Sequence, residues 1–157
     1  MKTFLEVYSP THRGISFLPD TSPIEGLGTA SQDVLYGSLF DDILRSLEGN
    51  DTIDGGKGND VLNGGLGNDT LTGGEGADLF EFTVGFGNDL ITDFKLGVDK
   101  ISILDEIGTP FTLAEYSDLG FSSLEGGGIK ITHQDLDGEI TLEDLTGGPS
   151  LDYFEII

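Results

Sequence analysis

The chain contains no cysteine and no tryptophan, and only 7 of its 157 residues are lysine or arginine. The lack of cysteine excludes disulfides, zinc–thiolate sites and thiol catalysis. The 29 acidic residues leave a net charge of −22, which argues against nucleic acid and anionic membranes as partners. No segment approaches the about 20 apolar residues of a membrane span, and charge interrupts the N-terminal stretch before a signal-peptide core of about 7–15 apolar residues could form. We therefore predict no membrane span and no conventional signal peptide.

Glycine is abundant, with 25 residues, and much of it belongs to a nine-residue repeat between Gly28 and Glu81. The copies 55–63 and 64–72 are nearly identical, and the copy 73–81 keeps each glycine and the aspartate. The units that begin at Gly28, Gly37 and Ser46 lose some of the glycines. All six units keep an apolar residue at the eighth place and an aspartate at the sixth: Asp33, Asp42, Asp51, Asp60, Asp69 and Asp78. After a two-residue break at Phe82 and Thr83, an imperfect seventh copy contains Asp89, and a degenerate eighth ends at Asp99 and Ile101.

This period predicts a parallel β-roll, an all-β solenoid of two sheets, over residues 28–101. Glycines allow the first six residues of each unit to form a turn, and the last three form a short strand with its central residue inward. Two units make one coil of eighteen residues, so that Asp33, Asp51 and Asp69 line one edge and Asp42, Asp60 and Asp78 the other. The inward residues should stack as the core: Leu35, Leu44, Ile53, Leu62, Leu71 and Phe80.

Carboxylates and turn carbonyls facing each other along these edges form an all-oxygen environment that suits Ca²⁺, with about 6–8 ligands, better than Mg²⁺. A Gly/Asp-rich stretch can also be a flexible acidic linker. An apolar residue occupies the eighth place in all six units, which favours an ordered roll. Without calcium, we expect the repeat to be disordered. Because the net charge opposes compaction, we expect about four to six calcium ions to be needed for folding.

The motif G-G-x-G-x-D-x-U-x in residues 55–63, 64–72 and 73–81 resembles the RTX family of secreted bacterial proteins. The resemblance implies that each ion takes the second, fourth and sixth residues of one turn and the first, third and sixth of the turn one coil later. The predicted ligands are Ser38, Phe40 and Asp42 with Gly55, Lys57 and Asp60; Leu47, Gly49 and Asp51 with Gly64, Leu66 and Asp69; and Gly56, Gly58 and Asp60 with Gly73, Glu75 and Asp78. Gly65 and Gly67 are further candidates at the second and fourth places. The first coil, with Asp33, lacks turn glycines, and its site is expected to be weak or absent.

Residues 87–101 resemble the segment with which many RTX rolls finish, and Asp89, Asp93 and Asp99 are candidate ligands there. A solvated acidic surface is the alternative interpretation of these three residues. The resemblance also implies secretion outside the cell through a type I apparatus with an uncleaved C-terminal signal. Residues 152–157, acidic and then hydrophobic, resemble such a signal, and a terminal edge strand explains them equally well.

Residues 1–27 are predicted to be an N-terminal cap or lead-in, with strands near 4–8 and 15–18. Residues 102–157 are predicted to form a β-rich C-terminal cap. The cap includes a hairpin between Ile129–Thr132 and Ile140–Glu143, and at most one short helix near 113–119. Residues 133–144 have EF-hand spacing, but a histidine stands first and strand-like sequence precedes it, which favours a hairpin loop.

Catalytic motifs are lacking, since the two histidines, His12 and His133, stand in no metalloprotease or serine-hydrolase setting. The composition does not exclude a pair of acidic residues for glycoside hydrolysis, but most of the acidic residues belong to the repeat. We predict a non-catalytic module that aids secretion and stability. Similarity to the repeat modules of alginate epimerases makes binding of an anionic polysaccharide the alternative function, although the cationic residues are few and scattered.

Overall fold

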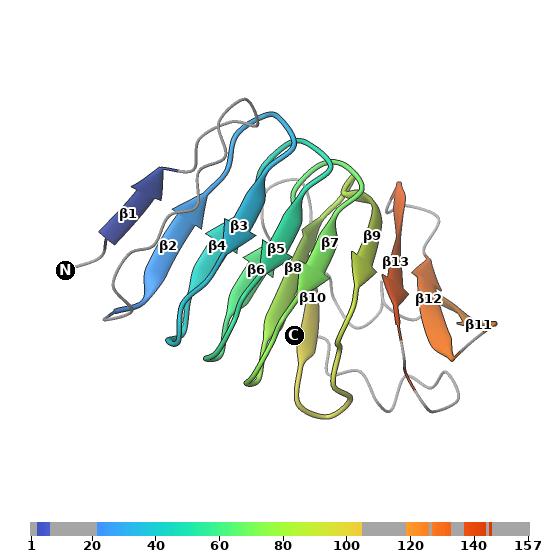
Figure 1. The fold of residues 1–157 in the computed structure, drawn as a ribbon. Helices are drawn as coiled ribbons and strands as arrows, with labels where there is room; N and C mark the ends of the chain where they lie inside the picture. The colour runs from blue at the N-terminus through green and yellow to red at the C-terminus, as the bar shows by residue number, and fades with distance from the viewer. Residues whose placement is uncertain are drawn as a thin grey trace.

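The computed structural model describes residues 3–6 (backbone only), 22–104, 119–125, 127–132, 137–143 and 145. These residues form strands and turns, and no helix occurs among them. The strands lie in two layers. Within the layers they follow one another along a common axis, from β1 at one end to β11 at the other (Figure 1). Their bounds are β1 Thr3–Glu6, β2 Ile24–Leu27, β3 Val34–Tyr36, β4 Ile43–Arg45, β5 Thr52–Asp54, β6 Val61–Asn63, β7 Thr70–Thr72, β8 Leu79–Thr83, β9 Gly87–Ile91, β10 Lys100–Leu104, β11 Gly120–Leu124, β12 Gly128–Thr132 and β13 Gly138–Leu142.

Successive strands of the repeat alternate between the two sheets, as predicted for a β-roll. One sheet has the order β1-β2-β4-β6-β8-β10, and the other has the order β11-β12-β13-β9-β7-β5-β3. Neighbours within the repeat pair in parallel with a shift of one coil, so that Leu44 lies opposite Leu62 and Ile53 opposite Leu71. This confirms the all-β parallel roll.

The core is one inward-facing residue per short strand. The central residues of β3 to β7, together with Phe80 of β8, are at most 1% exposed, as predicted from the eighth place. The two-residue break is absorbed by β8, which is longer and buries Phe82 as well as Phe80. The ring of Phe82 packs on that of Phe86 with centroids 5.0 Å apart. The parallel register then continues, with Leu71 opposite Ile91 and Phe80 opposite Ile101.

The roll begins upstream of Gly28, within the stretch expected as a lead-in. Strand β2 pairs in parallel with β4, with Gly26 opposite Leu44, and β1 pairs with β2. Gly26 therefore stands at an eighth place without a side chain, and a Cβ there would lie 2.8 Å from Leu44 Cδ2. Ile24 replaces aspartate at the sixth place, which left the sequence pattern without a signal for this unit. Of the two strands predicted near this end, β1 overlaps the one near 4–8, and the one near 15–18 lies outside the described residues.

The other end is covered by an antiparallel group of three strands. Strands β11, β12 and β13 pair in that order, and β13 joins the roll by parallel pairing with β9. The predicted hairpin is confirmed, because Ile129 lies opposite Leu142 and Ile131 opposite Ile140. Strands rather than helices flank residues 133–136, which agrees with a hairpin loop and not with an EF-hand. Most of the predicted helix near 113–119 and the whole of residues 152–157 lie outside the described residues. In the described part of the chain, no helix is long and apolar enough to cross a membrane.

The turns of successive coils also stack in direct backbone contact. The N–H of Leu66 donates to the carbonyl of Leu47 (2.7 Å), and the N–H of Glu75 donates to the carbonyl of Gly56 (2.9 Å). A Cβ built on Gly65 would lie only 1.7 Å from the carbonyl oxygen of Leu47. The glycines of the repeat thus permit close stacking as well as an unusual backbone conformation.

Two glycine-to-alanine changes separate these two roles. Gly65 and Gly97 both have positive φ, 89° and 76°, but nothing lies within 4 Å of a Cβ on Gly97. We expect Gly97→Ala to lower the free energy of unfolding of the calcium-loaded protein by about 1–2 kcal/mol, the strain of a left-handed residue. Gly65→Ala should lower it by at least about 2 kcal/mol more, because it also pushes two turns apart. Urea unfolding measures both, and equal losses would contradict the close stacking.

Candidate metal centre

Eight buried aspartates form two ladders, one along each edge of the roll. They are Asp33, Asp51, Asp69 and Asp89 on one edge, and Asp42, Asp60, Asp78 and Asp99 on the other, each at most 3% exposed. In every step, Oδ1 of one aspartate accepts the N–H of the aspartate one coil earlier. The six N···O distances lie between 2.7 and 3.0 Å. This edge alignment is the one predicted from the eighteen-residue coil.

Asp89 and Asp99 are full members of the ladders despite the irregular spacing before them. Asp89 follows Asp69 by 20 residues and Asp99 follows Asp78 by 21, yet the same hydrogen bond forms. Both are 2% exposed, so a solvated acidic surface does not describe them. Asp93 differs, because its two oxygens accept the N–H groups of Gly73 and Gly74, each at 2.8 Å. Asp93 thus binds the turn that begins at Gly73 without belonging to the ladder. Its role as a calcium ligand stays a prediction.

The second carboxylate oxygen divides the turns into two classes. In closed turns, Oδ2 accepts the N–H of the residue at the second place of its own turn. The three closed turns pair Thr29 with Asp33 (2.6 Å), Ser38 with Asp42 (2.5 Å) and Lys95 with Asp99 (2.8 Å). In open turns, Oδ2 is buried and has no hydrogen-bond partner within the described ranges. The aspartates of the open turns are Asp51, Asp60, Asp69, Asp78 and Asp89.

The backbone conformation at the second place accompanies this difference. All five open turns have a positive φ there: Leu47 (79°), Gly56 (94°), Gly65 (89°), Gly74 (96°) and Gly85 (88°). Thr29, Ser38 and Lys95, in the closed turns, do not. Positive φ belongs to a left-handed conformation that glycine adopts freely and leucine does not. Leu47 keeps its turn open even though glycine is missing.

In three of the five open turns, the unpartnered oxygen faces the first place of its own turn, where Gly55, Gly64 or Gly73 leaves room. A Cβ on Gly55 would lie 2.5 Å from Asp60 Oδ2 and 2.6 Å from the carbonyl oxygen of Gly73, one coil later. Similarly, a Cβ on Gly73 would lie 2.4 Å from Asp78 Oδ2. These oxygens therefore converge on one space between successive turns. Ser46 and Val84 hold the first place in the other two open turns, and the buried Ser46 hydroxyl donates to the carbonyl of Gly64 at 2.7 Å.

A cation in such a space must take most of its ligands from the backbone. Across the described ranges, no group of three or more Asp, Glu or His side chains gathers in a form that could hold a metal. Two carboxylates and the surrounding turn carbonyls form a donor set of hard oxygens, which fits Ca²⁺ with about 6–8 oxygen ligands. The unpartnered buried oxygens are the atoms that such an ion would satisfy.

Burial makes these carboxyl groups reluctant to ionise. Removal from water raises the pKa of Asp60 to about 7, that of Asp69 to about 6 and that of Asp89 to about 8. The backbone N–H from the preceding coil lowers each pKa in part, and the charge of the preceding aspartate raises it. Burial also raises the pKa of Asp51, Asp78 and Asp99. Without a cation, the ladders therefore favour protonated carboxyl groups.

The outer surface of the turns carries a second ladder, built from the fifth place. Asn50 Oδ1 accepts the N–H of Asn68, and Asn68 Oδ1 accepts the N–H of Asn88, both at 2.9 Å. On the other edge, Asn59 Oδ1 accepts the N–H of Ala77 at 2.9 Å. The recurrent Gly-Asn-Asp triplet was the sequence signal for these asparagines, but the nine-residue pattern requires only its glycine and aspartate.

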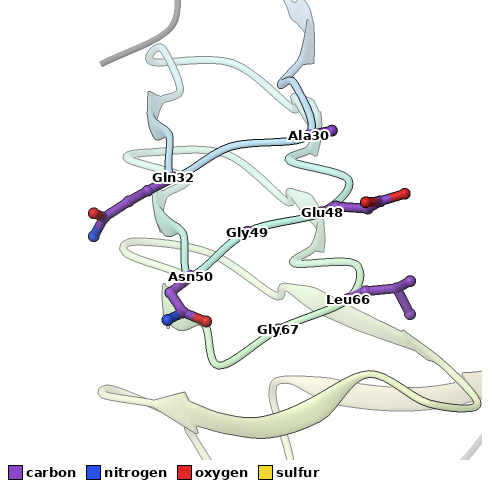
Figure 2. Close-up of a pocket in the computed structure, with 7 residues that line it drawn as sticks. All are labelled: Ala30, Gln32, Glu48, Gly49, Asn50, Leu66 and Gly67. Carbon is purple, nitrogen blue, oxygen red and sulfur yellow. The ribbon is translucent and has the colours of Figure 1, made fainter. Parts of the chain in front are cut away.

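A surface hollow lies over these turns. Gly49 and Gly67 lie between two rows of side chains, with Gln32 and Asn50 on one side and Ala30, Glu48 and Leu66 on the other (Figure 2). No ladder aspartate lines this hollow. It is therefore separate from the spaces into which the aspartate oxygens point.

Comparisons with known proteins agree with this geometry. A family model for the RTX calcium-binding nonapeptide repeat matches in 4 copies, over residues 27–62, 46–80 and 57–91. The R3 subunit of the mannuronan C5-epimerase AlgE6 of Azotobacter vinelandii is similar in structure, with 29% identity, 93% of this chain and 85% of that chain covered, and a TM-score of 0.61. The R2 subunit of the same epimerase has 30% identity, 86% and 92% coverage, and a TM-score of 0.58.

The fold also occurs in the extracellular lipase LipA of Serratia marcescens, with 23% identity and a TM-score of 0.58. That match covers 83% of this chain and 20% of the lipase. No curated protein sequence matches the chain.

The raised pKa values predict opposite effects of pH on the calcium-free and calcium-bound protein. The calcium-free fold holds protons that the unfolded chain releases, so its stability falls as the pH rises from about 4 to about 8. In protein that is folded without calcium, the ion must displace these protons, so the midpoint of calcium binding to that form should move to lower concentration over the upper part of that range. Circular dichroism in chelator, and calcium titrations at about pH 5.5 and about pH 8, test both effects. A midpoint that does not change with pH would rule out proton competition at the ladders.

Proposed function

Because this chain belongs to the RTX calcium-binding nonapeptide repeat family, we propose that it is a non-catalytic module that is unfolded at low calcium and folds on binding several ions outside the cell. In this role it supports type I secretion and the stability of a secreted protein. The observation that carries the proposal is the set of six buried aspartate oxygens without hydrogen-bond partners among the described residues, namely Oδ2 of the five open turns and Oδ1 of Asp33. Each would be costly to bury without a cation.

Calcium-dependent folding follows from two weaknesses of the roll. Most coils bury only two large apolar side chains, which is less than a small domain needs for stability. A net charge of −22 also opposes compaction. An ion bound between stacked turns satisfies the open oxygens, and because the unfolded chain lacks these spaces, binding free energy becomes folding free energy.

We propose that the strongest sites are the three gaps with an open turn on each side. Their ligand sets are Leu47, Gly49 and Asp51 with Gly64, Leu66 and Asp69; Gly56, Gly58 and Asp60 with Gly73, Glu75 and Asp78; and Gly65, Gly67 and Asp69 with Val84, Phe86 and Asp89. The first two match the sets expected from the motif, and the third spans the two-residue break. The gap between Asp42 and Asp60 and that between Asp33 and Asp51 each include a closed turn, so weaker sites are expected there.

Secretion fits this behaviour. Extracellular calcium-binding modules commonly have dissociation constants of about 10⁻⁴–10⁻³ M, so such sites stay empty in the cytosol. A chain that is unfolded there can pass through an export channel and fold outside. Similarity to epimerase subunits and to an extracellular lipase supports a secreted parent protein.

Replacing one aspartate in the middle and one at the start of the ladders tests the site assignment. Asp60 has an open oxygen and belongs to the gaps on both its sides, whereas Asp33 Oδ2 already accepts the N–H and hydroxyl of Thr29. We expect Asp60→Ala to raise the calcium midpoint of folding by about tenfold or more, equivalent to about 1.4 kcal/mol. Asp33→Ala should raise it by less than about threefold. Circular dichroism during calcium titration measures both midpoints, and equal effects contradict the proposed register.

The folding proposal itself has a separate control. Full β-sheet circular dichroism together with a compact scattering profile in excess chelator at about pH 8 would overturn it, because burial should disfavour the ionised ladder without calcium.

Binding of an anionic polysaccharide is a second candidate, favoured by the similarity to subunits of a mannuronan epimerase. The described cationic side chains are poorly placed for it. Arg45 pairs with Glu81 (3.4 Å), Lys57 with Glu75 (2.8 Å) and Lys130 with Glu139 (2.7 Å). Contact with a polyuronate would therefore depend on bridging calcium.

Titration of the calcium-loaded protein with oligouronates tests this candidate. Binding with heat release and chemical-shift changes near the turns is the expected result if the polysaccharide function is correct. A neutral oligosaccharide of equal length serves as the control. No heat and no shift changes would remove the candidate and leave the folding module.

A further inference from the structure

The last closed turn, residues 94–99, differs from the other two in the side chain at its second place. Thr29 and Ser38 turn their hydroxyls back to the aspartate of their own turn, at 2.8 and 3.0 Å. Lys95 instead reaches across to the preceding coil, where its ammonium donates to the carbonyl oxygen of Gly74. One residue thus contacts both sides of the gap between turns 73–78 and 94–99.

The backbone of Lys95 closes the gap from its own side. Its N–H donates to Asp99 Oδ2 at 2.8 Å, while Asp99 Oδ1 accepts the N–H of Asp78 at 3.0 Å. Both oxygens of Asp99 are therefore engaged by protein groups. In the gap between turns 55–60 and 73–78, by contrast, the aspartates on both sides keep an open oxygen.

The ammonium contacts an oxygen that an ion would otherwise use. The second-place carbonyl of a turn is one of the proposed ligands of the ion in the gap that follows, and Gly74 holds that place in turn 73–78. Asp93 fixes the same peptide segment by accepting the N–H groups of Gly73 and Gly74.

Charge agrees with this placement. Burial raises the pKa of Asp78 and of Asp99, and the positive charge of Lys95 offsets part of the rise at both carboxyl groups. The positive charge of Lys95 therefore acts on the aspartates on both sides of the gap. On the other edge, Asp89 at the end of its ladder keeps an open oxygen.

We propose that the Lys95 ammonium takes the place of a calcium ion between turns 73–78 and 94–99. This edge of the roll then ends on a cation that belongs to the chain, and the gap binds no metal. A tethered ammonium is present at any calcium concentration, although it supplies one charge where calcium supplies two. The inference rests on the proposed calcium sites of the other gaps.

The number of bound ions tests this assignment. Equilibrium dialysis at saturating calcium, with calcium counted by atomic emission, should find one more ion per chain in Lys95→Met than in the natural sequence. Lys130→Met removes the same charge from strand β12, where Lys130 pairs with Glu139 outside every proposed ligand set, and should leave the count unchanged. Lys95→Arg keeps the cation and should also leave it unchanged. An unchanged count in Lys95→Met overturns the proposal.

A crystal structure of the calcium-loaded natural protein gives a second test that depends on no variant. Anomalous scattering should locate ions in the gaps bounded by open turns and none between Gly74 and Asp99. An ion in that gap overturns the role of Lys95 even if Lys95→Met fails to fold. Absence of calcium from every gap would instead overturn the proposed function, so the two failures are distinguishable.

Discussion

The interaction on which this roll depends is the satisfaction of a buried carboxylate between two stacked turns. Oδ1 of each ladder aspartate beyond Asp33 accepts a backbone N–H from the coil before it, which ties successive coils together at both edges. The second oxygen decides the character of each turn. Where the turn supplies its own N–H, this second oxygen is satisfied. Where it does not, a buried oxygen and a raised pKa remain, and the fold needs a cation.

Ladder and core therefore stabilise the roll in different ways. The apolar column from Leu35 to Ile101 sets the spacing of the sheets and excludes water, but it is thin. The ladders set the register, and they keep it across the break at Phe82 and Thr83, where β8 lengthens and the aspartates remain aligned. Closed turns lie towards the two ends of the described roll and open turns between them. Protein groups thus satisfy Oδ2 of Asp33, Asp42 and Asp99, whereas Asp89, which ends the other ladder, keeps an open Oδ2.

Much of this architecture could be predicted from the residues. The nine-residue period identified the inward column and the edge alignment, because a parallel coil must place residues eighteen apart on top of each other. Strand β2 was not predicted, because its unit has Ile24 in place of the aspartate and Gly26 in place of the large apolar residue. The fifth-place asparagines were visible as a pattern, but their bonds join residues of different coils. The role of Asp93 as a clamp on Gly73 and Gly74 depends likewise on a contact across 20 residues.

The sequence by itself determined the period, the core and the identity of the ladder residues, since each follows from spacing and residue type. Only the tertiary structure decided which carboxylates are complete. That depends on the φ of the second-place residue and on what the neighbouring coil presents to it. Leu47 keeps a turn open where glycine is missing, and Lys95 closes a gap by reaching the coil before it. A linear motif records neither, because both are properties of two turns held in register by the strands between them.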